Sequence, residues 1–382
     1  MAADNRTASV RRCNLAIAAV FVAAISLPAA ANLAGMDGAD AAAENRELAD
    51  WPRLGSAPSA AAYATAFGRW FEDHFGFRAT LVRWYGETRL FWLGVSPSPA
   101  VIKGRDGWLF YADDGGIEDC TNETALSAAE LEDWRDALVA TRDWLRARGM
   151  AYVFTIAPDK HAIYSEELPP GLRRVHAESR ADQVHAMLAH GTDIAYVDVR
   201  PALFEAKRRE RIYFQTYTHW NERGVLVAYQ QLVDAVRRQT PAVPPPWTRE
   251  DFQPAERTVQ GMDLARMIGL MRVLHEVDLT LIPKRLRRAR VVEPAGAEPS
   301  AEEGRLATEI AGSPLPRAVV FRDSFGSRLA PFLSEHFSRA VYLWQNDFDP
   351  EIVLRERPDV VIQEIAGRHL YVYTPSPELV PR

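Results

Sequence analysis

Cysteine is scarce in this 382-residue chain, which has only Cys13 and Cys120. An apolar run separates the two, so a membrane at that run would keep the thiols apart and exclude an internal disulfide. The sequence also lacks metal-ligand spacing, a Gly-rich phosphate-binding loop and a nucleotide fingerprint. We therefore expect no metal and no cofactor.

An excess of positive charge is missing as well. The formal net charge is -6, with 47% hydrophobic and 25% charged residues. This balance gives no reason to expect a nucleic-acid partner. The composition is that of a globular protein, and the length suits either several domains or one large α/β domain with insertions.

The most apolar part of the chain is its N-terminal segment. The run NLAIAAVFVAAISLPAAANLAG follows Arg6, Arg11 and Arg12 and precedes an acidic flank. Basic residues before such a run and acidic residues after it place the remainder of the chain outside the cytoplasm. We interpret residues 1–36 as a signal anchor, or as a signal peptide cleaved near PAAA, and residues 37–66 as a linker. A buried helix of a soluble protein is the alternative.

Strand and helix signals alternate through the rest of the chain. Ser127 and Glu130 form a capping box, and a helix is also expected around residues 329–337. Apolar runs predict strands, namely AYVFTIAP, DIAYVDV, RIYF, RAVVF, AVYLW and DVVIQEI. This order predicts an α/β fold, a mostly parallel sheet with helices on both faces. We assign it to one domain over residues 67–382, with an irregular insertion at about 241–316.

Two side chains at the expected carboxyl edge of this sheet could do chemistry. Ser324 lies directly after the strand at 317–321, and His219 lies on a loop before a helix that Asn221 can cap. A serine nucleophile needs a base, and a histidine that titrates near neutrality suits that task. Either residue alone has an ordinary structural interpretation, so the prediction depends on their sharing one edge.

Several motifs, taken in order, resemble one known family. They are ENREL, DHFGFR, GRDGWLFY, APDKHAIY, THW, GMDLARMIGL, FRDSFGSRLAPFLSEHF and PDVVIQEI. In these motifs the chain resembles the alginate O-acetyltransferase-like proteins of the SGNH-hydrolase-like group. The resemblance implies a circularly permuted SGNH core, with His before Ser, and acetyl transfer onto an exported polysaccharide. It also implies a periplasmic location and a membrane acyltransferase as acetyl donor.

The resemblance assigns Ser324 as nucleophile and His219 as base, but the third triad position differs. The family has an aspartate two residues before the histidine, where this chain has Tyr217. A phenol is neutral near pH 7 and cannot offset the charge of an imidazolium. Asp159, Asp198 and Asp323 are alternative carboxylates, and the sequence does not rank them.

Three further side chains are candidates for substrate binding. Trp220 could stack on a sugar ring, and Arg322 and Lys160 could meet sugar carboxylates. The structural alternatives are core packing for Trp220, and solvation or an ion pair for Arg322 and Lys160. The basic run KRLRRAR could meet an acidic polymer or lipid headgroups, or form a solvated face.

The predicted function is therefore O-acetylation of an exported bacterial polysaccharide through a seryl acyl-enzyme. Its expected partners are the polysaccharide acceptor, the membrane acyltransferase and, through the N-terminal segment, the inner membrane. Two alternatives stay open. Tyr217 favours a catalytically degenerate polysaccharide-binding or assembly protein, and the same acyl-enzyme would serve a carbohydrate acetyl esterase.

Overall fold

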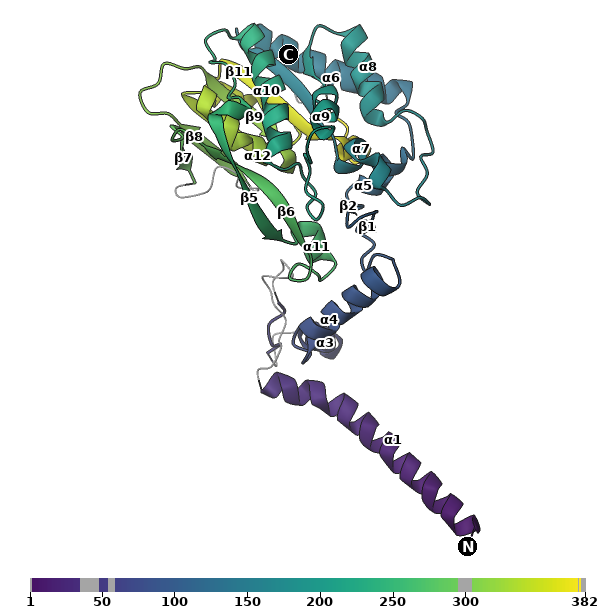
Figure 1. Ribbon diagram of the computed structural model, residues 1–382. Helices are drawn as coiled ribbons and strands as arrows, with labels where there is room; N and C mark the ends of the chain where they lie inside the picture. The colour runs from purple at the N-terminus through teal and green to yellow at the C-terminus, as the bar shows by residue number, and fades with distance from the viewer. Residues whose placement is uncertain (1, 35–47, 54–58, 295–303, 377, 379–382) are drawn as a thin grey trace. The chain divides into compact units, whose positions relative to one another are not determined.

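The computed structural model describes residues 2–34, 48–53, 59–294, 304–376 and 378. The chain divides into two compact units, residues 1–97 with 265–271 and residues 98–264 with 272–382. Figure 1 colours the chain from one end to the other. Much of the expected linker, residues 37–47 and 54–58, lies outside the described residues, as does the acidic flank of the apolar run.

The first unit is helical in its described N-terminal part. Helix α1 spans Ala2–Leu33, and its stretch Arg11–Asn32 is long and apolar enough to cross a membrane, with a mean hydropathy of 2.1. Helices α3 (Ala60–Asp73) and α4 (Arg78–Glu87) follow, with a π-helical turn at Thr88–Trp92. The Trp70 ring packs against Trp51 and His74 at centroid distances of 4.5 and 4.9 Å.

The second unit is built around a seven-stranded sheet, shown in Figure 1. Its strands, in spatial order, are β4 (Ala195–Val197), β3 (Ala151–Ala157), β11 (Val360–Ala366), β9 (Arg317–Arg322), β10 (Arg339–Trp344), β8 (Arg305–Glu309) and β7 (Arg290–Glu293). The first five run parallel, and β8 and β7 add an antiparallel edge. This confirms the predicted mostly parallel sheet.

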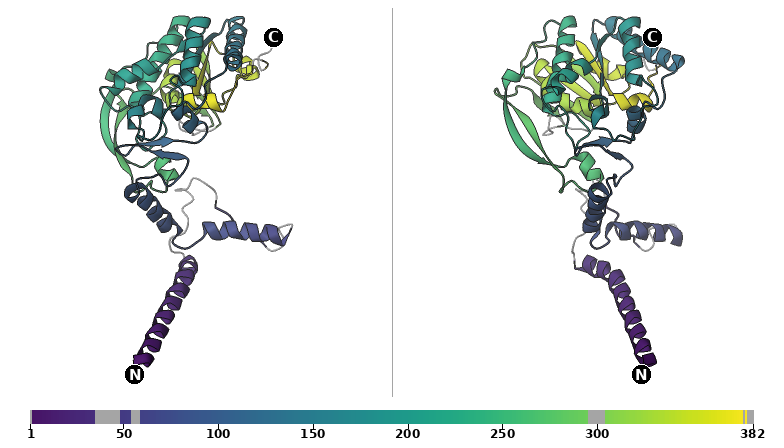
Figure 2. Two further views of the ribbon diagram at one scale, coloured as in Figure 1. Left: turned by 90° about the vertical axis from the view of Figure 1, so that its right-hand side faces the viewer. Right: turned by 45° about the vertical axis from the view of Figure 1, so that its right-hand side comes forward.

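Helices cover both faces of the sheet, as the two turned views in Figure 2 make plain. Val153, Val320 and Ile362 pack in one apolar cluster with α10 (Glu222–Gln239) and α12 (Ser324–Leu333). Their strand neighbours, such as Phe154 and Phe321, pack in a second cluster with α6 (Ala128–Arg146) and α8 (Arg180–Gly191). Successive side chains of a strand point to opposite faces, so strands buried on both faces are apolar throughout.

Shorter elements complete the second unit. They are α5 (Gly116–Thr121), α7 (Lys160–Ile163), α9 (Arg200–Lys207), α11 (Asp263–Met267, which runs into the first unit), α13 (Pro350–Glu356) and the hairpin β1–β2 (Val101–Lys103, Leu109–Tyr111). Turns of 3-10 helix occupy Ser165–Glu167, Arg249–Asp251, Ser334–His336 and Gly367–Tyr371.

Residues 241–316 were expected as an irregular insertion, but their described parts, 241–294 and 304–316, hold four strands. Strands β5 (Phe252–Gln260) and β6 (His275–Pro283) form a long antiparallel hairpin, and β7 and β8 join the main sheet. The strand expected at RIYF is wrong, because this segment forms only an isolated bridge between Tyr213 and Trp220. The Ile212 amide donates instead to the Tyr164 hydroxyl, 3.0 Å away, so side chains replace a strand partner.

Candidate active site

Ser324 is the first residue of α12 and directly follows the central strand β9 and Asp323. The Asp323 carboxylate caps the helix by accepting the Phe325 N–H at 2.8 Å. The predicted helix start near residue 329 is therefore wrong by more than one turn, because the cap acts before the apolar stripe begins. A serine in the first turn of a helix lies among backbone N–H groups that have no partner within the helix, and such groups can stabilise an oxyanion.

Asp323 is held by groups from the chain after β11. Its Oδ2 accepts the Ala366 N–H at 2.6 Å and lies 3.3 Å from Nδ1 of His369. Burial raises the pKa of Asp323, but the neighbouring charges of His369 and Arg368 outweigh it and hold the pKa below its usual value. Burial, and then the charge of Asp323, raise the pKa of Glu364 well above its usual value.

His219 ends a loop whose backbone is held by a buried lysine. Lys160 Nζ donates to the carbonyl oxygens of Phe214, Gln215 and Tyr217 at 3.1, 3.0 and 2.7 Å. Burial lowers the pKa of Lys160 to about 7, against the raising charges of Asp263 and Glu276. The three carbonyl oxygens offer partners for all three ammonium protons, so the lysine orders the loop.

Two carboxylates hold the amides of the same loop. Glu276 on β6 accepts from the Gln215 and Thr216 N–H groups at 2.9 and 3.0 Å. Asp263 accepts from the Thr218 N–H at 3.0 Å and from its hydroxyl at 2.6 Å. Sequence reasoning missed both acids, although Asp263 lies in the quoted motif GMDLARMIGL.

The His219 imidazole is buried, with 4% of the residue exposed, and is packed between rings. Its ring centre lies 4.7 Å from that of Tyr217 and 4.6 Å from that of Phe325, the residue after Ser324. Neither ring nitrogen has a hydrogen-bond partner among the residues that the structure describes. Burial, and then the charge of Arg368, lower the pKa of His219 to about 3, so the imidazole is neutral at pH 7.

The three alternative carboxylates all bind other groups. Asp159 accepts from the Arg368 guanidinium at 2.9 Å, Asp198 pairs with Arg200 at 2.9 Å, and Asp323 caps α12. Among the described residues, therefore, no carboxylate is hydrogen-bonded to His219. Asp323 and Asp159 influence it only through their charges, against those of Arg368 and Arg328.

The expected substrate-binding side chains all lie in the interior. Arg322 is 0% exposed and donates to the Asp323 carbonyl oxygen. Trp220 is 1% exposed and packs against Phe325, and Lys160 is 3% exposed. Their expected role in substrate binding finds no support here. Lys160 instead acts on the loop that carries His219.

We expect the low pKa of His219 to make the fold acid-sensitive. The folded-state pKa lies below the unfolded value of 6.5, so this contribution to stability is present above pH 6.5 and is lost as the pH falls toward 3. Between pH 7 and 5 the loss should be about 2 kcal/mol. Glutamine does not titrate, so the unfolding free energy of His219→Gln should fall by about 2 kcal/mol less than that of wild type between pH 7 and 5. Denaturant titration at each pH measures this difference. Parallel pH curves for the two proteins would contradict this.

Asp159 and Arg368 form a buried ion pair beside this site. The Asp159 carboxylate accepts from the Arg368 backbone N–H and from its guanidinium, at 2.8 and 2.9 Å. Removing one partner leaves a buried charge, so Asp159→Asn should lower the unfolding free energy by about 3 kcal/mol. Asp136→Asn is the matched control, since its exposed pair with Arg135 should contribute under about 1 kcal/mol. Equal losses in the two variants would refute the assignment.

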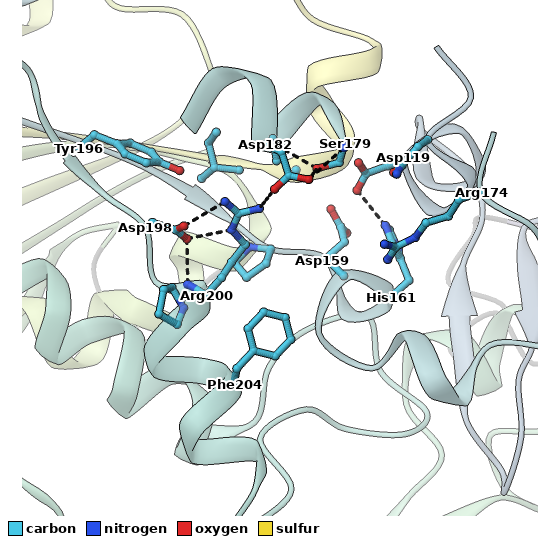
Figure 3. Close-up of a pocket in the computed structure, with 17 residues that line it drawn as sticks. Asp119, Asp159, His161, Arg174, Ser179, Asp182, Tyr196, Asp198, Arg200 and Phe204 are labelled. Carbon is cyan, nitrogen blue, oxygen red and sulfur yellow. Dashed lines mark hydrogen bonds and ion pairs between the residues drawn. The ribbon is translucent and has the colours of Figure 1, made fainter. Parts of the chain in front are cut away.

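A cavity of about 310 Å³ opens at the same edge of the sheet, beyond β3 and β4 (Figure 3). Asp119, Asp159, His161, Asp198 and Arg200 line it, but neither Ser324 nor His219 does. His161 Nε2 lies 2.8 Å from Asp119 Oδ2, so these charged groups already have partners. The cavity is therefore separate from the Ser324 and His219 pair, and Asp198 belongs to it.

This architecture, a mostly parallel sheet with helices on both faces and a serine at the helix start after a central strand, is that of SGNH-hydrolase-like proteins. The family described as "SGNH hydrolase-like domain, acetyltransferase AlgX" matches residues 101–348, well over half of the chain. The chain belongs to this family, as its sequence motifs predicted.

Individual relatives match over shorter stretches. A probable alginate O-acetylase AlgJ of Pseudomonas putida is 32% identical over 143 residues, which are 37% of this chain and 35% of that protein. Its Pseudomonas aeruginosa counterpart is 27% identical over 234 residues, 60% of this chain and 56% of that protein. The structure of Bacillus cereus PatB1 shares the fold at a TM-score of 0.50 and 15% identity, covering 71% of this chain and 96% of that one.

Proposed function

We propose that this protein transfers acetyl groups onto an exported polysaccharide through an acetyl-Ser324 intermediate, with His219 as the base. The observation that carries the proposal is the buried imidazole of His219, which has no partner among the described residues and packs against the residue next to Ser324. Both ring nitrogens are therefore available to the hydroxyl of Ser324 or of a substrate.

In the first step the Ser324 Oγ attacks the acetyl carbonyl of the donor while His219 takes its proton. That proton then goes to the departing donor group. In the second step an acceptor hydroxyl attacks the acetyl-serine carbonyl, His219 takes the hydroxyl proton, and the proton returns to Ser324 Oγ. Backbone N–H groups in the first turn of α12 would stabilise the oxyanion in both steps.

The proposed location is the periplasm, with α1 in the inner membrane and a membrane acyltransferase supplying acetyl groups. The supporting observations are the apolar stretch Arg11–Asn32 and the basic residues before it. The names of the relatives, probable alginate O-acetylases, favour a polysaccharide acceptor. A catalytically degenerate, polysaccharide-binding role is the second candidate, because Tyr217 replaces the carboxylate that would orient His219.

Acyl release from a chromogenic acetyl ester, with and without acceptor oligosaccharide, separates the candidates. For the full-length protein in neutral detergent, we expect release that the acceptor accelerates, with acetyl appearing on the oligosaccharide. Release into water that ignores the acceptor would identify an esterase. No release, together with retained binding of the oligosaccharide, would identify the degenerate role.

A further inference from the structure

Arg328 lies one helical turn after Ser324 on α12, so the two share one face of the helix. Side chains on a helix lean toward its N-terminus, which directs Arg328 toward Ser324. Its guanidinium carbon lies 5.8 Å from the ring centres of both Phe214 and Tyr217. The Arg328 side chain therefore lies near the Tyr217 ring, which packs against the His219 imidazole.

Arg328 is half-buried, and its guanidinium has no hydrogen bond or ion pair with any described residue. Other half-buried arginines bind oxygen atoms of two kinds. Arg89 and Arg180 donate to carbonyl oxygens at 3.0 and 2.8 Å, and three others lie near carboxylates. Arg200, Arg223 and Arg339 are also half-buried and lie 2.9, 3.7 and 3.0 Å from carboxylate oxygens of Asp198, Asp278 and Glu356. The N–H donors of Arg328, which lie near the rings of Phe214 and Tyr217, are therefore available to an anion.

His219 gives a second, independent sign of a missing group at the same place. Its imidazole is buried with both nitrogens unpaired among the described residues. The Tyr217 ring centre lies 4.7 Å from the imidazole centre and 5.8 Å from the guanidinium carbon. The Arg328 guanidinium and the neutral His219 imidazole thus both lie near Tyr217, at the position where the family has an aspartate.

We propose that Arg328 binds a carboxylate of the acceptor sugar, as in a uronic acid, and that this carboxylate supplies the negative charge which the site lacks beside His219. The inference rests on the proposed function and adds a specificity-determining residue to it. Arg328 is one of the charges that lower the pKa of His219. A bound carboxylate neutralises that charge, so acceptor binding raises the pKa of His219 and strengthens it as a base.

Binding of a uronate tetrasaccharide, and of the same compound with its carboxyl groups reduced to alcohols, tests the first half of the proposal. Calorimetry on the full-length protein in neutral detergent should show that the acidic form binds about 10- to 100-fold tighter. Arg328→Gln should remove this preference and Arg328→Lys should keep part of it, since lysine retains only a point charge. Arg355→Gln is the matched control, because it removes an exposed arginine on α13 and should behave as wild type.

Equal binding of the two tetrasaccharides by wild type, or an undiminished preference in folded Arg328→Gln, overturns the proposal. If that variant does not fold, the wild type still decides. Its preference must shrink as salt rises from about 0.05 to about 0.5 M, because screening weakens a partly exposed charge pair, and a salt-independent preference refutes the ion pair.

The pH profile of acyl transfer tests the second half. The acid limb should lie at higher pH with the acidic acceptor than with the reduced one, and Arg328→Gln should abolish the difference. A preference in binding without any acyl release would refute the proposed reaction and leave the Arg328 site standing. Acyl release with no preference between acceptors would do the opposite.

Discussion

Replacing Ser324 by alanine is expected to reduce acyl release by about a thousandfold or more. The reason is chemical, because alanine offers no oxygen that can carry the acetyl group, and His219 then has no proton to take. Ser324 is half-buried and its hydroxyl makes no hydrogen bond with a described residue. Alanine also suits the helical position, so the fold should be retained.

The measurement is release of the chromophore from an acetyl ester, with mass spectrometry of the intact protein for the acetyl-serine. Ser165→Ala is the control, since it removes an exposed serine in a 3-10 turn and should leave both readouts unchanged. Acyl release that persists in Ser324→Ala would remove Ser324 as nucleophile. A mass increase of one acetyl group in wild type only would support the covalent step.

Replacing Tyr217 by aspartate is expected to raise acyl release by about a hundredfold. In serine proteases, exchanging the aspartate behind the histidine for asparagine lowers turnover about ten-thousand-fold, and part of that loss comes from the wrong tautomer. The Tyr217 ring adjoins the unpaired His219, and the Arg328 guanidinium lies 5.8 Å from the ring centre. A carboxylate here would orient the imidazole and raise its pKa, while Arg328 offsets the cost of its burial.

Tyr217→Phe is the matched control, because it keeps the ring and removes only the hydroxyl. Comparing the two variants by initial rate and by pH profile separates the carboxylate from loss of the tyrosine. Aspartate should shift the acid limb upward, and phenylalanine should leave it in place. If both variants are equally active, the missing carboxylate is not what limits this site.

Alternating strand and helix signals predicted the sheet well, because strands buried on both faces are apolar throughout and easy to recognise. The strands β3, β9, β10 and β11 lie where apolar runs predicted them. Segments that depend on distant partners were harder to predict. The hairpin β5–β6 is polar over most of β5, with only Phe252 buried on that strand, so it offered no apolar run. The RIYF segment had a strand-like sequence but no strand partner.

The candidate site was likewise predicted only in part from the sequence. Ser324 and His219 could be proposed because each follows a recognisable local pattern, and the His219 imidazole packs against Phe325, the residue after Ser324. The groups that hold them are far away in sequence. Glu276 reaches across 61 positions to Gln215, and Asp323 lies 43 positions from Ala366. Such contacts leave no periodic trace in the sequence, so His369, Asp263 and Glu276 were not identified.

The hairpin β5–β6 has a practical consequence for anyone shortening this protein. Glu276 lies on β6, and Asp263 lies just after β5. Trimming residues 252–283 to obtain a shorter fragment would therefore remove Glu276 and Asp263, two of the three side chains that hold the loop before His219. Such a fragment would keep Ser324 and His219 but would no longer fix the position of the imidazole.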